Sequence, residues 1–161
     1  MEELRFFKRL FEYDYWGNHE ALGSVATAPG AAENAQQFFN HIVGAERIWL
    51  ARFADPDPRH LAPWPTLTLD ECRVEFEKLH TEWIALLDQL TPEKLAGDLA
   101  YRNMKGVEFT TPIQDVLMHL VMHSAYHRGQ VAKAVREAGG KPSATDYVVY
   151  VRQSGADNSQ R

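Results

Sequence analysis

The chain has 161 residues, of which 45% are hydrophobic and 24% are charged, and its formal net charge is −5. These values predict one soluble globular domain with its own core. The 17 Lys and Arg residues are dispersed along the chain, so no basic surface for nucleic acid is expected. The sequence also lacks a run of about 20 apolar residues and the pattern of a signal peptide. We therefore expect a cytoplasmic protein with neither a nucleic-acid nor a membrane partner.

Two helices are predicted in the first third of the chain, over residues 2–26 and 34–54. Apolar residues recur at helical spacing in both segments. The first pattern stops near Pro29-Gly30, and the second ends in the helix-breaking run at residues 55–58. Residues 55–69 contain four prolines and are expected to form a long connection.

The third predicted helix begins after Thr68 and continues to about Leu90. Thr68 is the expected N-cap, and Glu71 stands three residues later, as in a capping box. A second long connection follows from Thr91 to Thr111. Within it, two short segments flank Lys105-Gly106 and predict a small hairpin, over residues 99–103 and 107–110.

The fourth predicted helix has Thr111 as its N-cap and Pro112 at its first position, and it ends at Gly139-Gly140. Residues 147–151 predict a short extended segment, and residues 154–161 a polar tail. Together the elements predict an all-α four-helix bundle, with long connections between helices two and three and between three and four. Residues 1–153 are expected to form this single metal-binding domain.

Three histidines recur at four-residue intervals on the fourth predicted helix: His119, His123 and His127. Side chains at this spacing share one helical face, and the surrounding residues are mostly apolar. Because an unpartnered buried imidazole is costly, a metal ion is the expected partner. His119 and His127 are about 12 Å apart along the axis, so one ion binds either His119 and His123 or His123 and His127. Periodicity does not decide between these pairs.

A third ligand is needed for a tight site, and His41 is the best candidate. It lies between Phe38, Ile42 and Ala45 on the inward face of the second predicted helix. The other histidines are poorer candidates. His60 lies in the proline-rich connection, His80 lies off the apolar stripe of the third helix, and His19 lies among polar residues of the first helix. One histidine from the second helix and two from the fourth would leave one position open, as in catalytic zinc sites.

Several of these motifs resemble the DinB/YfiT-like family of bacterial four-helix metalloproteins. The sharpest match is residues 123–130, His-Ser-Ala-Tyr-His-Arg-Gly-Gln. Asn40-His41-Ile42 and Glu46-Arg47-Ile48-Trp49 add to it, and Tyr15-Trp16-Gly17-Asn18 and Asp146-Tyr147 look like weaker landmarks of the family. The resemblance spans essentially the whole chain.

The resemblance implies a divalent metal ion, nickel or zinc, held by His41, His123 and His127, with His119 outside the ligand set. Characterised branches of the family use a low-molecular-weight thiol. The implied function is a metal-dependent enzyme that activates a thiol, or water, for transfer to a small electrophilic substrate. The alternative is a non-catalytic metal- or ligand-binding stress-response protein. A homodimer is expected, since the family often dimerises. No residue is assigned as catalytic; Tyr126 and His119 are the nearest candidates for a general base.

Four residues near the predicted ligands have two interpretations each. Arg128 is expected at the edge of the bundle, where it either meets a substrate carboxylate or an acidic side chain of a partner, or pairs with a residue such as Glu137. Gln130 either orients a ligand or is a surface amide. Trp49 and Trp16 either line a pocket around the metal or belong to the core.

Overall fold

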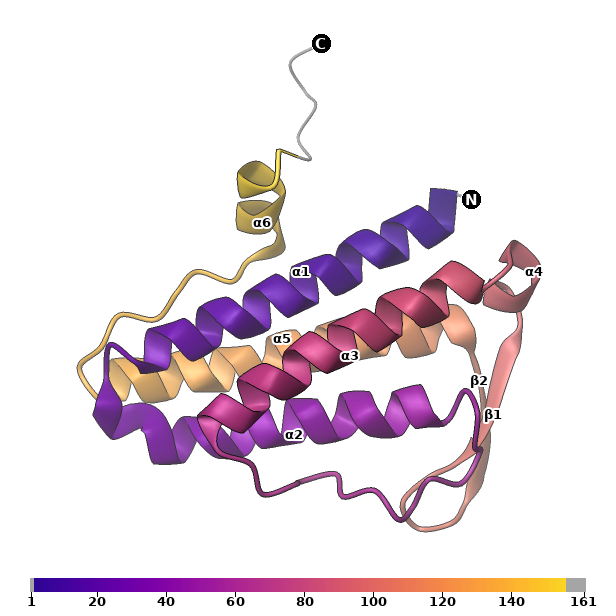
Figure 1. The fold of residues 1–161 in the computed structure, drawn as a ribbon, viewed down its shortest axis with the longest axis horizontal. Helices are drawn as coiled ribbons and strands as arrows, with labels where there is room; N and C mark the ends of the chain where they lie inside the picture. The colour runs from indigo at the N-terminus through magenta and orange to yellow at the C-terminus, as the bar shows by residue number, and fades with distance from the viewer. Residues whose placement is uncertain (1, 156–161) are drawn as a thin grey trace.

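Four long helices make up most of the fold and run side by side (Figure 1). The computed structural model describes residues 2–155, so most of the predicted tail, residues 156–161, lies outside the described part. The long helices are α1 (Glu2–Val25), α2 (Ala32–Ala51), α3 (Leu69–Gln89) and α5 (Ile113–Glu137). The shorter elements are η1 (Pro29–Ala31), α4 (Pro92–Leu95), β1 (Asp98–Arg102), β2 (Glu108–Pro112) and α6 (Tyr147–Gln153).

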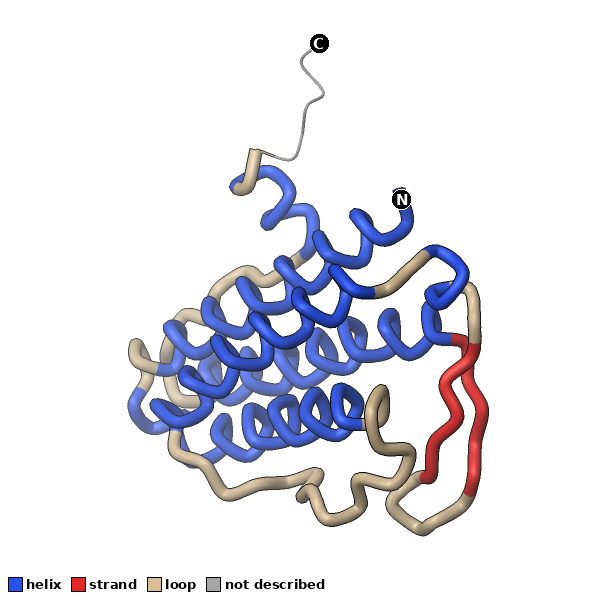
Figure 2. Tube along the Cα trace, turned by 45° about the vertical axis from the view of Figure 1, so that its right-hand side comes forward, coloured by secondary structure: helices blue, strands red, loops and turns tan. Residues whose placement is uncertain are grey.

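The predicted hairpin is present, and its strands β1 and β2 lie beside the ends of the long helices (Figure 2). Tyr101 pairs with Phe109 in the antiparallel register, and Gly106 supplies the positive φ of 80° that the turn requires. The predicted start of the fourth helix is wrong by one residue. Thr111 pairs with Leu99 and is held in an extended conformation, so α5 begins at Ile113 with Pro112 as its N-cap.

The start of α3 confirms the predicted capping box. The Thr68 hydroxyl accepts a hydrogen bond from the Glu71 backbone N–H at 3.2 Å, and the Glu71 carboxylate accepts one from the Thr68 backbone N–H at 2.8 Å. Such a cap satisfies two of the helix's otherwise unpaired donors. The first residue of α3 is therefore determined locally, without help from the rest of the fold.

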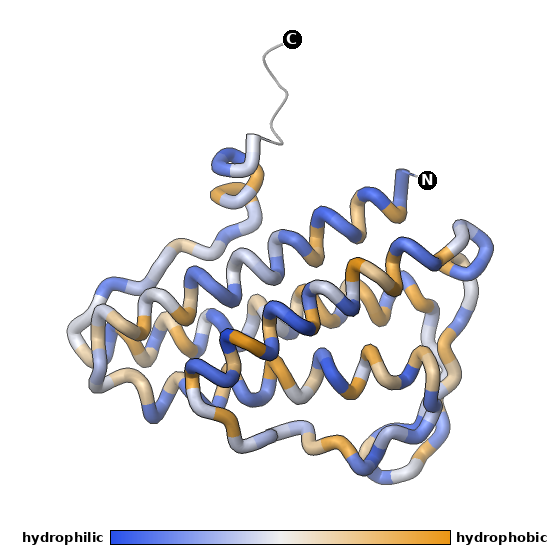
Figure 3. The backbone as a smooth tube through the Cα atoms, viewed as in Figure 1, coloured by the Kyte–Doolittle hydropathy of each residue, from blue (hydrophilic) through white to orange (hydrophobic). Residues whose placement is uncertain are grey.

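The core lies between the four long helices. α1 and α2 each pack against both α3 and α5. Hydrophobic positions recur along each long helix between hydrophilic ones (Figure 3), so one stripe of each can face its neighbours. Each large apolar side chain fully buried in this way contributes about 1.5–3 kcal/mol. Buried examples are Val25 of α1, Phe39 and Ile42 of α2, Phe76 and Trp83 of α3, and Leu117 and Val131 of α5.

The predicted extended segment near the C-terminus is wrong, because residues 147–153 form helix α6. Tyr147 and Tyr150, one turn apart, both pack on Tyr13 of α1, with ring centroids 5.1 and 5.8 Å away. Tyr150 also packs on Trp16, at 5.6 Å. A helix places residues three apart on one face, whereas a strand places them on opposite faces. Between residues 2 and 155, no helix is long and apolar enough to cross a membrane.

Candidate metal centre

Three histidines from two facing helices converge: His41 of α2 with His123 and His127 of α5. The Nε2 atom of His123 lies 3.2 Å from that of His41 and 3.2 Å from that of His127. All three candidate ligand atoms lie within 4.8 Å of one another. Nitrogens bound to one tetrahedral ion at about 2.0–2.1 Å are separated by roughly 3.4 Å. This histidine cluster therefore has the spacing of a ligand set and could hold a metal ion.

Two of the three rings are held in the tautomer that metal binding requires. The Nδ1 atom of His41 lies 2.9 Å from the backbone oxygen of Pro63, and the Nδ1 atom of His127 lies 2.5 Å from Oε1 of Gln130. Because these oxygens only accept hydrogen bonds, each Nδ1 carries the proton. Each Nε2 is left with a lone pair directed into the cluster, which is how the outer partners of metal-binding histidines act. Gln130 thus makes the contact expected of a residue that orients a ligand.

The surroundings favour the uncharged form of His123 and His127. Burial lowers the pKa of His123 to about 4, and the neighbouring rings of His127, His41 and His119 add to this effect. Burial also lowers the pKa of His127, more than the hydrogen bond to Gln130 raises it. At neutral pH His123 and His127 are therefore in the uncharged form that binds metal ions.

Aromatic side chains border the histidine cluster. The Trp64 indole stacks on His41, with centroids 3.9 Å apart and planes 8° from parallel, and Tyr126 meets His127 edge-on at 5.1 Å. Trp64 is 51% exposed and Tyr126 66% exposed, so this border lies at the protein surface. Sequence reasoning missed Trp64 because the proline-rich connection has no periodicity that shows which way a side chain points. The prolines on either side of it were the available signal.

His119, Trp49 and Trp16 lie outside the histidine cluster. The His119 ring centroid is 5.5 Å from that of His123 and 5.7 Å from that of Trp49, and it is absent from the converging ligand set. Trp49 also packs on Tyr101 of the hairpin. The ring contacts of Trp16 are with Tyr13 and Tyr150, which places it at the junction of α1 and α6.

Arg128 is buried between the long helices instead of lying at an edge, so both predicted roles for it are wrong. It is 1% exposed, and its Nη1 donates to Asp14 at 2.6 Å and to Asn18 at 2.9 Å. Gly17 of α1 makes room for it, since a Cβ there would lie 2.9 Å from the guanidinium carbon. Glu137 pairs with Lys133 instead. The spacing of Asp14, Gly17 and Asn18 was the available signal in the sequence. It places a carboxylate, a residue without a side chain and an amide on one face of α1, where an arginine can be accommodated.

Glu46 completes a second buried polar group, the carboxylate–arginine cluster of Asp14, Glu46 and Arg128. Its Oε1 lies 3.5 Å from Nδ2 of Asn18, which also contacts Asp14. Burial and the negative charge of Asp14 raise the pKa of Glu46 well above its ordinary value. Burial raises the pKa of Asp14 as well, but the ion pair with Arg128 favours its charged form. We therefore assign the proton to Glu46.

The fold and the site together define a mostly helical protein whose three-histidine cluster is positioned to hold a metal ion. The family model described as "DinB family" matches residues 27–159, so the chain belongs to the DinB family. It is also 25% identical over 160 residues to "Protein DinB" of Bacillus subtilis (strain 168), an alignment that covers 89% of this chain and 92% of that protein. No solved structure matches the chain.

Proposed function

We propose that His41, His123 and His127 bind one divalent metal ion, zinc or nickel, and that the protein is a metal-dependent enzyme. Its reaction would transfer a low-molecular-weight thiol, or water, to a small electrophilic substrate. The observation that carries the proposal is the convergence of three imidazole nitrogens, with Nε2 of His123 3.2 Å from Nε2 of both His41 and His127 and all three ligand atoms within 4.8 Å of one another. Two of these atoms have their lone pairs directed inward by hydrogen bonds at the opposite side of the ring. Lone pairs repel one another, so a cation is the partner that this geometry favours.

The residues of the chain would hold the ion, and the ion would activate the nucleophile. The four long helices, which we take to be a four-helix bundle, keep the ligands on the facing helices α2 and α5. When bound, the metal would lower the pKa of a thiol or water at its open position. The chain's one cysteine is Cys72. It is fully buried and donates to Asn40, and burial raises its pKa to about 12. A thiol nucleophile would therefore have to come from a second substrate.

A non-catalytic metal- or ligand-binding protein is the second candidate, and the position of Trp64 favours it. The indole lies flat on His41 and covers part of the cluster's outer side. A bound ion shielded by aromatic rings would serve structure or storage better than turnover. The two candidates differ in whether the ion keeps a position that substrate can reach.

Two measurements test this proposal. Protein purified without an affinity tag is analysed for its metal content, and thiols are then screened against electrophiles with native, metal-stripped and reloaded protein. We expect about one divalent ion per chain, and a transfer rate that is lost on stripping and restored on reloading. One ion per chain without transfer for any pair would favour the non-catalytic candidate. Absence of stoichiometric binding, even after metal is added, would refute the metal-dependent enzyme and the metal-binding form of the second candidate.

A further inference from the structure

We propose that Gly44 is a positioning residue of the metal centre. Its missing side chain lets residues 62–64 lie against α2, where the backbone oxygen of Pro63 holds His41 in the Nδ1–H tautomer. The atoms that a Cβ at Gly44 would meet belong to Ala62 and Pro63 and not to a ligand ring, so its effect passes through Pro63. The inference rests on the proposed metal centre, but its main consequence can be measured in metal-free protein.

The contact between Gly44 and residues 62–64 leaves no room for a side chain. A Cβ at position 44 would lie 2.5 Å from the Pro63 oxygen, 2.7 Å from its carbonyl carbon and 2.8 Å from the Ala62 oxygen. Real Cβ atoms essentially never approach other atoms closer than 3.0 Å. All three neighbours are backbone atoms, so no rotamer change relieves the clash. Any other residue at position 44 therefore displaces this part of the connection.

Displacement of residues 62–64 would remove two contacts from His41 at once. Gly44 is three residues after His41, so both lie on one face of α2. The Pro63 oxygen is 2.9 Å from Nδ1 of His41, and the Trp64 ring stacks on the same imidazole at 3.9 Å. A hydrogen bond of this kind weakens steeply when it lengthens or bends. One stretch of backbone therefore determines both the tautomer and the packing of this ring.

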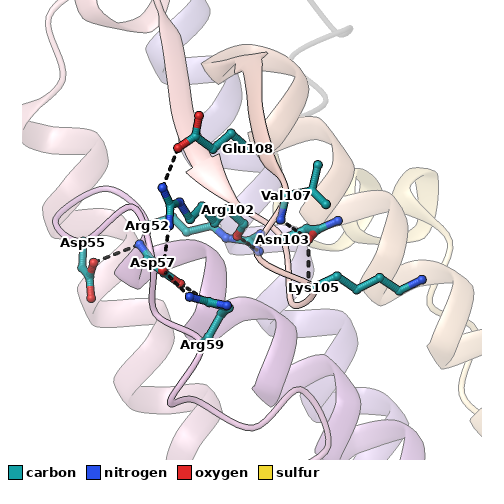
Figure 4. Close-up of polar contacts among 9 residues, drawn as sticks. All are labelled: Arg52, Asp55, Asp57, Arg59, Arg102, Asn103, Lys105, Val107 and Glu108. Atoms are coloured by element: carbon teal, nitrogen blue, oxygen red, sulfur yellow. Dashed lines mark hydrogen bonds and ion pairs between the residues drawn. The ribbon is translucent and has the colours of Figure 1, made fainter.

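The connection is anchored on its other side to the hairpin, as Figure 4 shows. Asp57 pairs with Arg59 at 2.5 and 2.8 Å and lies 3.8 Å from Arg102. The Arg102 backbone N–H donates to the Pro56 oxygen at 2.8 Å, and Arg52 donates to the Arg102 oxygen at 3.0 Å. Because residues 56–59 are tied to β1 in this way, the place where the connection turns back toward His41 is fixed. Its approach to α2 then depends on the room left at Gly44.

The test compares Gly44→Ala with Gly23→Ala and Gly129→Ala. All three positions are inside long helices, so each variant makes the same gain in helix propensity. A Cβ at Gly23 or Gly129 meets no atom within 4 Å. The readouts are the His41 tautomer in metal-free protein, from long-range ¹H–¹⁵N NMR, the zinc affinity from competition titration, and the thermal unfolding midpoint.

We expect wild type and both controls to show His41 with the proton on Nδ1. Gly44→Ala should show a mixture of tautomers or the Nε2–H form, and should bind zinc about 10–100-fold more weakly, as when the outer partner of a ligand is lost. The proposal is overturned if Gly44→Ala keeps the tautomer and zinc affinity of the controls. It is also overturned if wild-type His41 carries its proton on Nε2, a result that needs no variant and so stands even if Gly44→Ala fails to fold. If wild type keeps the Nδ1–H tautomer but binds no zinc, the proposed metal centre fails and the role of Gly44 in holding His41 survives.

Discussion

The histidine cluster and the carboxylate–arginine cluster both place several polar side chains among the long helices, but they differ in how those groups are satisfied. Arg128 brings a positive charge to within 2.6 Å of Asp14, and Asn18 bonds to both Arg128 and Asp14. Donors and acceptors thus come from the same chain. In the histidine cluster the converging atoms are three imidazole nitrogens, and at least two of them are acceptors. A cation from outside the chain would balance them.

Burial of polar groups does not by itself indicate a functional site. A buried ion pair whose opposite charges come from the same chain ties helices together, here α1 to α5. In the histidine cluster, hydrogen bonds at Nδ1 of His41 and His127 leave the Nε2 atoms as acceptors that face one another. Such a set of acceptors is suited to binding a group that the chain does not supply. Whether the buried groups are opposite charges or like acceptors, more than their burial, distinguishes a structural cluster from a binding site.

Removal of a ligand should have the largest effect. His127→Ala leaves two imidazoles for the ion and should abolish stoichiometric zinc binding, and His123→Ala should do the same. The apolar stripes supply most of the stability, so circular dichroism should show native helix content in both variants. If both variants are unfolded under conditions where wild type is folded, the histidine cluster is a structural element, like the carboxylate–arginine cluster.

Removal of the internal cation should destabilise the fold without depending on metal. Arg128→Met leaves Asp14 buried without its partner and should lower the free energy of unfolding by about 3–5 kcal/mol. Denaturant titration of metal-free protein measures this loss. The matched control is Arg136→Met, which changes an exposed arginine of the same helix and should shift stability by no more than about 0.5 kcal/mol. Equal stabilities of the two variants would show that the ion pair is unimportant.

The proton assigned to Glu46 gives the carboxylate–arginine cluster a pH dependence. The folded-state pKa of Glu46 is raised above 4.5, so above pH 4.5 the unfolded chain loses this proton before the folded one does. This residue's contribution to stability therefore falls as pH rises, by at most about 1.4 kcal/mol per pH unit. The groups that face it are Asp14, Arg128 and, at the same small cavity, His80.

Glu46→Gln removes this titration and should gain stability relative to wild type between pH 5 and pH 8. Free energies of unfolding at several pH values measure the difference. Glu82→Gln, on an exposed position of α3, is the control and should follow wild type. A difference between Glu46→Gln and wild type that stays constant with pH would place the proton elsewhere.

The smallest effect is expected at His119, which neighbours the histidine cluster without joining it. His119→Ala should keep a zinc stoichiometry near one and weaken affinity by about tenfold, the lower end for a residue outside the ligand set. The same titration on His127→Ala provides the comparison. Loss of zinc from the His119 variant but not from the His127 variant would show that the ligand pair on α5 is one turn closer to the N-terminus.

Local and periodic signals predicted most of the helical fold. The apolar stripes located all four long helices to within a few residues, and Thr68 with Glu71 marked the start of α3. Helix α6 was predicted as extended because a run of valines and tyrosines suits a strand, while its helical form depends on Tyr13, over 130 residues away. The expected homodimer stays a prediction.

At the site, too, the sequence predicted contacts within one helix better than contacts between separate segments. The four-residue spacing of His123 and His127 is visible in the sequence, whereas the choice between two pairs came from the family resemblance. Arg128 was misplaced because its burial depends on the space at Gly17 of another helix. Pro63 and Trp64 were missed because a proline-rich connection has no period. Contacts within one helix can be predicted from spacing, but contacts between a helix and an irregular segment need the three-dimensional structure.

X-ray absorption spectroscopy of the zinc-loaded wild-type protein tests the central claim most directly, because it counts the ligands of the ion. If His41, His123 and His127 hold the metal, the spectrum should show three imidazole nitrogens at about 2.0–2.1 Å with a further light atom or substrate thiol in the open position. A shell with one imidazole or none would contradict the claim that the three converging Nε2 atoms form the metal centre.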